Sequence, residues 1–193
     1  IKTCGSLVDQ AYDLGFNILD TAPAYGLSEQ RLGDILKTRA AQDWLICTKA
    51  GENYDIKNKK SSFDFSTKSI KSSLHNSLKL LNRSHIDIFL IHSDGNDLEI
   101  LEQDELIQTL YDLKKDGLIR AHGISTKTVP GGLLACDLLD VVMVTHNLNY
   151  QDEISVINKA HELQKGVLIK KGLASGNLTN PISAGIKFVL DTQ

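Results

Sequence analysis

The chain has 193 residues, of which 41% are hydrophobic and 23% are charged. This composition is typical of one globular domain with a sizeable core. Its 21 basic residues nearly balance 24 acidic ones, for a net charge of −3, so charge gives no reason to expect nucleic acid or an anionic membrane as a partner. Because no segment approaches the roughly 20 apolar residues of a membrane span and the start has no apolar signal core, we expect a cytoplasmic protein.

The cysteines give no sign of a metal or a disulfide. Cys4, Cys47 and Cys136 are odd in number and widely spaced, and they form no CxxC or Cys/His cluster of the kind that zinc needs. We therefore expect reduced thiols and no metal site.

Short apolar runs alternate with amphipathic segments, which is the pattern of parallel βαβ units. The expected strands are 16–20, 44–49, 86–92, 121–125, 141–146 and 167–170. The expected helices are 7–14, 28–36, 66–81 with Ser66 as N-cap, one through Leu106, Leu110 and Leu113, 154–163 with Gly166 following its C-terminus, and 182–190. No repeat or linker-like tract divides the chain, so we expect a single domain over residues 1–193.

Two architectures accommodate these units, a closed eight-stranded barrel and an open doubly wound sheet. No strand is followed by the G-x-G-x-x-G segment of a doubly wound dinucleotide fold, which favours an α/β fold of the (β/α)8 barrel class. Barrels of this class have about 250 residues. We therefore expect an incomplete barrel, with a first strand before Ile1 and a last strand after Gln193.

Three titratable residues stand at the ends of successive predicted strands: Asp20, Lys49 and His92. The carboxyl ends of parallel barrel strands meet at one rim, where enzymes of this fold place their chemistry. A single polar residue at such a junction is more often structural, but three in order favour a site. A lysine that ends an apolar strand needs a carboxylate partner, and Asp20 is the candidate.

Tyr25 follows Asp20 by five residues in a loop that Pro23 stiffens. A phenol is a weak acid at neutral pH. A lysine ammonium beside it stabilises the phenolate, which is the tuning that a general acid needs. A structural tyrosine is the alternative interpretation.

The segment Gly-Phe-Asn-Ile-Leu-Asp-Thr-Ala-Pro-Ala-Tyr-Gly at 15–26, followed by Ser28-Glu29 and Leu32-Gly33, closely resembles the first signature of the aldo-keto reductase family. The resemblance continues through Ile-Cys-Thr-Lys at 46–49, Asp-Ile-Phe-Leu-Ile-His at 87–92, Gly-Ile-Ser at 123–125 and Gly-Leu-Ala-Ser-Gly at 172–176. It extends roughly from Leu7 to Leu190.

The resemblance implies a catalytic tetrad of Asp20, Tyr25, Lys49 and His92, and reversible hydride transfer between NADP(H) and an aldehyde or ketone. Tyr25 would protonate the developing alkoxide, Lys49 would increase the acidity of Tyr25, Asp20 would orient Lys49, and His92 would position the carbonyl. The cofactor residues implied are Ser125, Lys170, Gly172, Leu173 and Ser175, and no metal is required. The chain departs from common family residues at Thr126, Met143, Lys170 and Gly172.

Other functions stay open at this point. A non-catalytic nucleotide-binding or regulatory protein on the same scaffold would also fit, although its tetrad would be expected to be damaged. A lyase or aldolase with Lys49 as Schiff base would need a neutral lysine, which the predicted carboxylate partner opposes. The segment 51–65 is expected to be a long solvated loop rather than a cover for the site. The substrate and the oligomeric state cannot be derived from the sequence.

Overall fold

The computed structural model describes residues 2–39, 42–55, 57–179 and 181–192. Contacts within the chain form two compact units. Unit 1 comprises Ile1–His92 and Gln108–Ala121, and unit 2 comprises Ser93–Ile107 and His122–Gln193. Each unit is described by itself below, and the single domain over residues 1–193 stays a prediction.

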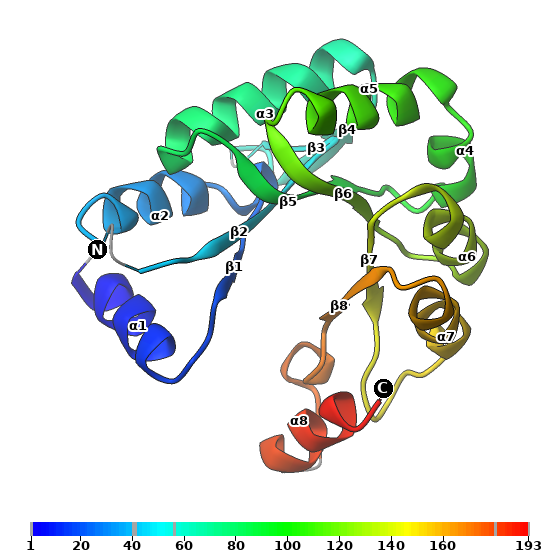
Figure 1. Ribbon diagram of the computed structural model, residues 1–193. Coiled ribbons are helices and arrows are strands. Elements are labelled where there is room, and N and C mark those ends of the chain that lie inside the picture. The colour runs from blue at the N-terminus through cyan, green and yellow to red at the C-terminus, as the bar shows by residue number, and fades with distance from the viewer. Residues whose placement is uncertain (1, 40–41, 56, 180, 193) are drawn as a thin grey trace. The chain divides into compact units, whose positions relative to one another are not determined.

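Unit 1 is built on three parallel strands, which neighbour one another in the order β1, β2 and β5 (Figure 1). Helices follow the first two strands, and a small antiparallel hairpin, β3–β4, stands between β2 and α3. Its elements are α1 (Lys2–Asp13), β1 (Ile18–Asp20), the 3-10 helix η1 (Pro23–Tyr25), α2 (Ser28–Leu36), β2 (Leu45–Ala50), β3 (Glu52–Asp55), β4 (Lys60–Phe63), α3 (Thr67–Leu81) and β5 (Ile86–His92).

Unit 2 contains a second parallel set, with β7 between β6 and β8 (Figure 1). Helix α5 (Asp104–Lys115) and strand β6 (Ile119–Ser125) each begin in one unit and end in the other. The remaining elements are α4 (Asp97–Leu101), α6 (Val129–Leu138), β7 (Val141–Thr145), α7 (Ile154–Glu162), β8 (Gly166–Lys170), the 3-10 helix η2 (Ala174–Gly176) and α8 (Ile182–Leu190).

All six predicted strands and all six predicted helices are present, with end differences of a few residues. Strand β1 starts at Ile18 instead of Phe16, whose side chain is 63% exposed. The predicted cap of α3 is confirmed, because the Ser66 side chain accepts a hydrogen bond from the Ser69 backbone N–H at 3.3 Å. The apolar period therefore located the helices and strands well.

Two local predictions were wrong. Gly166 does not follow a helix C-terminus but begins β8, and the left-handed residue after α7 is Gln164, with φ 54°. The segment 51–65 is not an irregular loop, because it contains the hairpin β3–β4. Its strands are almost wholly polar, so they lack the apolar alternation by which a strand is recognised.

Two helices, α4 and α6, were also missed, and α6 begins at residues that are typical of a turn. Pro130, Gly131 and Gly132 are typical of a turn, yet the helix begins there because Thr128 accepts a hydrogen bond from the Gly131 N–H and proline is tolerated in a first turn. The two glycines allow close packing, since an added Cβ would meet the Asp97 side chain at Gly131 and the Val156 side chain at Gly132.

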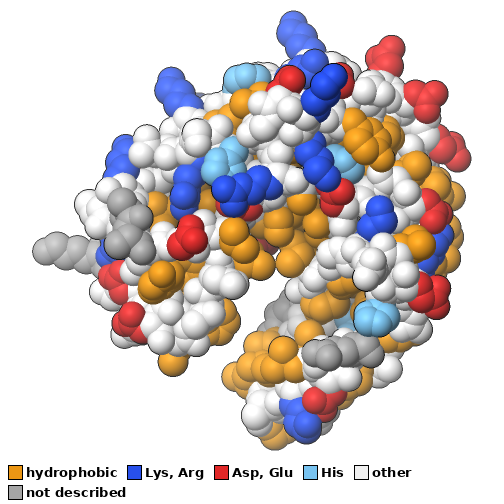
Figure 2. All heavy atoms as spheres, in the orientation of Figure 1, with side chains coloured by type: hydrophobic (Ala, Val, Ile, Leu, Met, Phe, Trp, Pro, Cys, Tyr) orange, Lys and Arg blue, Asp and Glu red, His pale blue; other side chains and the backbone are white. Residues whose placement is uncertain are grey.

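The cores of both units consist of apolar side chains from the strands and the inner helix faces. In unit 1, Ile70, Leu74 and Phe89 are fully buried. Apolar side chains also lie at the surface over α1 and over α8 (Figure 2), where Leu7 is 66% and Ile182 64% exposed. Among the described residues, no helix is long and apolar enough to cross a membrane.

Helices α2 and α3 approach each other at Gly33. A Cβ built on Gly33 would lie 1.9 Å from the Leu80 carbonyl oxygen, which belongs to the backbone of α3. Because that oxygen cannot rotate away as a side chain would, the helices could accept a larger residue only by moving apart. Gly33 therefore fixes the distance between two helices that cover this part of unit 1.

Replacement of Gly33 by alanine should lower the free energy of unfolding by about 1–3 kcal/mol, the usual cost of overpacking. Alanine is the better helix former, so propensity alone predicts the opposite sign. Urea denaturation of G33A shows whether stability falls through overpacking or rises through helix propensity. Q30A, at an exposed site of the same helix, is the control. A G33A protein as stable as the wild type would contradict the close approach of these helices.

Candidate active site

The four residues predicted to form a tetrad lie together in unit 1. Asp20 ends β1, His92 ends β5, Lys49 is the next-to-last residue of β2, and Tyr25 ends η1. Because β1, β2 and β5 are parallel and adjacent, their carboxyl ends lie at one edge of the sheet. The fold thus brings together residues that span more than seventy positions in the sequence.

Lys49 is a buried cation with a fixed set of partners. Its side chain is 1% exposed, and Nζ donates to Asp20 Oδ1 at 2.6 Å and to the Thr21 carbonyl oxygen at 2.9 Å. Burial by itself would lower the Lys49 pKa, but the charge and the hydrogen bond of Asp20 act against it and, with contributions from Tyr25 and Cys47, the pKa lies above its ordinary value. Lys49 is therefore an ammonium at neutral pH.

Tyr25 is held over this ammonium by the short helix η1. The Tyr25 N–H donates to the Ala22 carbonyl oxygen, and Pro23 restricts the turn. Lys49 Nζ lies 5.0 Å from the centroid of the Tyr25 ring, whereas the tyrosine itself is 48% exposed. The phenol is thus reachable from solvent on one side and faces a buried positive charge on the other.

His92 is the other member of the tetrad in contact with Tyr25. The two rings meet edge to face, with centroids 6.2 Å apart and planes at 89°. His92 Nδ1 lies 2.8 Å from Oε2 of Glu52 on β3, and each of these side chains is 18% exposed. An imidazole and a phenol therefore stand side by side at the edge of unit 1, each with a charged neighbour.

Further polar contacts fix the strand ends behind the tetrad. Glu29 of α2 is buried and accepts a hydrogen bond from Thr48 Oγ1 at 2.7 Å, and Thr21 donates to Ser28 at 2.8 Å. Burial raises the pKa of Glu29. The Cys47 thiol also has a raised pKa because of burial, so it remains protonated and is a poor nucleophile.

The residues predicted to bind a cofactor lie in unit 2. Lys170, at the end of β8, donates through Nζ to Ser125 Oγ at 3.0 Å and also to the Thr126 carbonyl oxygen. Burial lowers the Lys170 pKa to about 8, against an opposing attraction from Glu153. Ser125 and Lys170 are therefore in direct contact, and a substantial fraction of Lys170 is neutral near pH 8.

The backbone after β8 has an unusual conformation. Lys171, Ala174 and Ser175 all have φ between 51° and 56°, a region that non-glycine residues seldom adopt. The Asn147 side chain donates to the Lys171 carbonyl oxygen at 2.9 Å and supports the start of this segment. Gly172 and Leu173 lie here and line an apolar pocket of about 150 Å³ against α8.

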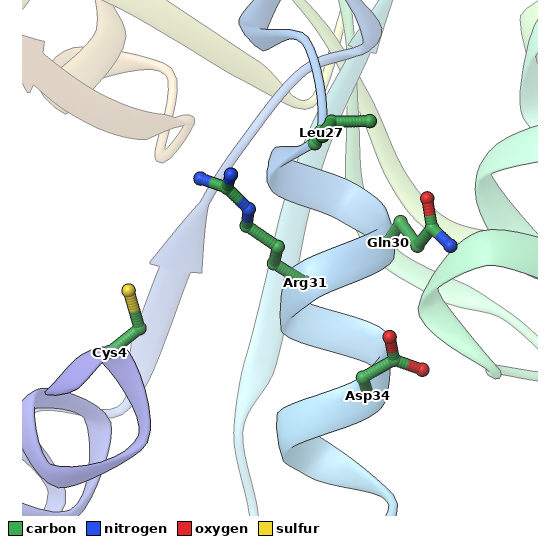
Figure 3. Close-up of a pocket in the computed structure, with 5 residues that line it drawn as sticks. All are labelled: Cys4, Leu27, Gln30, Arg31 and Asp34. Atoms are coloured by element: carbon green, nitrogen blue, oxygen red, sulfur yellow. The ribbon is translucent and has the colours of Figure 1, made fainter. Parts of the chain in front are cut away.

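A larger hollow of about 430 Å³ lies between α1 and α2 (Figure 3). Cys4 lines it from α1, and Arg31 extends from α2 toward the same side. The other lining residues are Leu27, Gln30 and Asp34. Because no residue of the tetrad lines this hollow, we do not assign the chemistry to it.

Glu52, Glu29 and Glu153 are site residues that the sequence did not predict. Glu52 stands in the segment interpreted as a solvated loop, where an acidic residue is unremarkable. Glu153 is 1% exposed, accepts from the Thr145 N–H at 3.1 Å, and has a raised pKa because of burial. No periodicity distinguishes such buried carboxylates from exposed ones. The only sign of Glu29 in the sequence was its place in the segment that resembles the family signature.

The Asp20–Lys49 pair is asymmetric in burial, and this gives a test. D20N would leave the buried ammonium with only a carbonyl and an amide, so we expect a loss of about 1–3 kcal/mol in the free energy of unfolding. K49M should cost less, because Asp20 is 41% exposed and water can solvate it. Urea denaturation at pH 7 measures both variants. An equal or larger loss in K49M would contradict a cation held by Asp20.

The lowered pKa of Lys170 predicts a pH dependence of stability. Between about pH 8 and the ordinary lysine pKa of about 10.4, the unfolded chain binds more protons at this site than the folded protein. The contribution of Lys170 to stability therefore increases with pH over that window.

Urea denaturation at pH 7.5, 9 and 10 should show this increase in the wild type and its loss in K170M. The matched control is K68M at an exposed lysine of α3, which should retain the wild-type dependence. Parallel curves for wild type and K170M would rule out a lysine neutralised by burial.

Comparison with known proteins identifies the family of the chain. The model of the Aldo/keto reductase family matches residues 4–180. Aldo-keto reductase YhdN of Bacillus subtilis is 30% identical over 193 residues, which cover 97% of this chain and 57% of that protein. L-galactose dehydrogenase of Arabidopsis thaliana is 36% identical over 124 residues, or 61% of this chain and 36% of that protein. The chain thus spans roughly half or less of these relatives' length.

Solved structures agree in fold. The structure of PA4992 from Pseudomonas aeruginosa, itself assigned to the aldo-keto reductases, has a TM-score of 0.91 at 45% identity, over 99% of this chain and 73% of that one. Aldo-keto reductase AKR11C1 of Bacillus halodurans, in its holo form, has a TM-score of 0.80 at 28% identity, over 92% of this chain and 60% of that one. The predicted fold, an incomplete (β/α)8 barrel of this type, is confirmed, and the chain belongs to the aldo/keto reductase family of oxidoreductases.

Proposed function

We propose that the protein transfers a hydride between NADP(H) and the carbonyl of an aldehyde or ketone, with Tyr25 as the general acid. The observation that carries this proposal is the position of the exposed Tyr25 phenol over the buried Lys49 ammonium. A binding protein would have no need to bury a lysine and pair it with Asp20 beside a phenol. Membership of an oxidoreductase family supports the same reaction.

During carbonyl reduction, Tyr25 donates its phenolic proton to the carbonyl oxygen as negative charge develops there. The phenolate that remains is stabilised by the Lys49 ammonium, which burial keeps away from competing water. Asp20 and the Thr21 carbonyl oxygen fix the position of Lys49, so the charge requires little reorganisation during the reaction. His92 is the second polar group at the carbonyl oxygen.

Lys49 is a poor candidate for a Schiff base. That chemistry needs a neutral amine as nucleophile, whereas Asp20 keeps the pKa of Lys49 above its ordinary value. The lyase or aldolase alternative is therefore disfavoured by the electrostatics of the site.

For unit 2, we propose that Ser125, Lys170, Gly172, Leu173 and Ser175 bind the nicotinamide cofactor. Ser125 accepts from Lys170 through Oγ, which leaves its own O–H as a donor for a carboxamide oxygen. The donors of Ser125 and Lys170 therefore fit a polar, planar amide. When bound, NADPH supplies the two electrons and the hydrogen gained by the carbonyl carbon, and a related reductase has been solved in a holo form.

The substrates proposed are small aldehydes and ketones, and aldoses are the first to test. L-galactose dehydrogenase and D-threo-aldose 1-dehydrogenase are among the relatives, at 36% and 28% identity. Location in the cytoplasm stays a prediction from the sequence.

The full-length protein should bind NADPH and reduce an aldehyde, and Y25F should retain binding but lose about 10²–10⁴-fold in kcat, as for removal of a general acid. Fluorescence titration with NADPH and with NADH measures binding and cofactor preference. Absorbance at the reduced nicotinamide band measures turnover, with L-galactose and NADPH as the reductive assay and the corresponding alditol and NADP+ as the oxidative assay.

Tyr111 provides a matched control, because it is 45% exposed and lies on α5 outside the tetrad. Y111F should keep the wild-type turnover. If a folded full-length protein binds no nicotinamide cofactor, the proposal is wrong. If it binds NADPH but Y25F turns over as fast as the wild type, Tyr25 is not the acid.

A further inference from the structure

Glu52 is not part of the predicted tetrad, but it pairs with His92, which is. Glu52 is the first residue of β3, and its Oε2 lies 2.8 Å from His92 Nδ1. The other carboxylate oxygen accepts a hydrogen bond from Ser61 Oγ of β4 at 2.5 Å. Ser61, Glu52 and His92 therefore form a short chain from the hairpin to the end of β5.

The turn at Gly51 makes this contact possible. Gly51 has φ 106°, and a Cβ there would meet the Phe65 ring at 2.5 Å. Its carbonyl oxygen accepts from the Asp64 N–H, which closes the base of the hairpin. Glycine thus allows the chain to reverse two residues after Lys49, so that β3 lies beside η1 and carries Glu52 to His92.

This contact constrains the proton positions on the imidazole. A carboxylate oxygen at 2.8 Å would repel the lone pair of a bare ring nitrogen, so the contact favours a proton on Nδ1. In a neutral imidazole, Nε2 would then be a bare acceptor and would repel a carbonyl oxygen. The ring can donate from Nε2 only as a cation, whose charge Glu52 neutralises.

We propose that Glu52 is a positioning residue that keeps His92 doubly protonated, so that Nε2–H can donate to the carbonyl oxygen during reduction. This inference rests on the proposed reductase function and adds a residue to it. Tyr25 then contacts one member of each of two ion pairs, Lys49 of Asp20–Lys49 and His92 of Glu52–His92. In the oxidative direction the neutral ring is the useful form, because Nε2 can then accept from the alcohol hydroxyl.

Among the described residues of unit 1, the titratable groups near His92 are Glu52 on β3 and Tyr25 on η1, followed by Lys49 and Asp20. The positive charge of Lys49 disfavours an imidazolium at His92, and the negative charge of Asp20, which is paired with Lys49, opposes this effect. Because Glu52 is the group in direct contact with His92, it decides whether the surroundings stabilise or destabilise the imidazolium. Removal of the Glu52 charge makes the imidazolium less stable.

The test uses E52Q in the full-length protein, because glutamine has nearly the shape of glutamate but carries no charge. The pH at which reductive kcat/KM falls on the alkaline side should move down by about one unit, as expected for loss of a close opposite charge. The oxidative profile should move in the same direction on its acid side. A steric role alone would lower the rate without moving either profile.

NMR titration of the His92 ring gives a readout independent of turnover. Its midpoint should move down in E52Q. It should move down by less in S61A, because without the Ser61 hydrogen bond the Glu52 carboxylate is no longer held beside Nδ1. S61A also serves if E52Q does not fold. D55N removes a charge elsewhere on the same hairpin and should leave the midpoint unchanged.

The possible failures can be told apart. If the wild type reduces aldehydes in a Tyr25-dependent manner but E52Q and S61A leave the profile and the His92 midpoint unchanged, the role of Glu52 is refuted and the reductase stands. If the midpoint moves but the wild type reduces no carbonyl, the proposed function fails while the pairing holds.

Discussion

The burial of one positive charge is the constraint on which the site depends. Lys49 lies near the end of β2, and the residues on either side of it, Thr48 and Ala50, are buried. An unpaired ammonium at this position would cost a large amount of folding free energy. Asp20 and the Thr21 carbonyl oxygen compensate it. Because both partners belong to the end of β1 and its following turn, the ion pair also fixes where that turn, and with it Tyr25, must lie.

Buried carboxylates have a similar structural role elsewhere in the chain. Glu29 accepts from Thr48, next to Lys49, and Asp97 in unit 2 accepts from the N–H groups of Lys127 and Thr128 at 2.9 and 2.7 Å. In each case a carboxylate from a helix holds the carboxyl end of a strand or the turn that follows it. Ionic and hydrogen-bonded contacts thus position the loops, whereas apolar packing positions the strands and helices.

The sequence predicted the helices and strands that have a periodic apolar pattern. It did not predict features that depend on contacts between distant residues. The stripe of Ile70, Leu74, Leu78 and Leu81 predicted α3. The strand-end positions of Asp20, Lys49 and His92 predicted their convergence. The polar hairpin β3–β4 had no such signal, because its stability comes from a glycine turn and from contacts with other elements. Glu52 could therefore not be distinguished from a solvated acidic residue until the path of the chain after Gly51 was known.

Proton transfer from Tyr25 depends on the Lys49 ammonium beside it. Turnover of an aldehyde with NADPH by the full-length protein and by K49M, with fluorescence titration of NADPH binding in both, measures this directly. We expect K49M to bind NADPH but to lose about 10²–10⁴-fold in kcat, since only the wild type stabilises the phenolate that the transfer leaves. Equal turnover by the two proteins would contradict it.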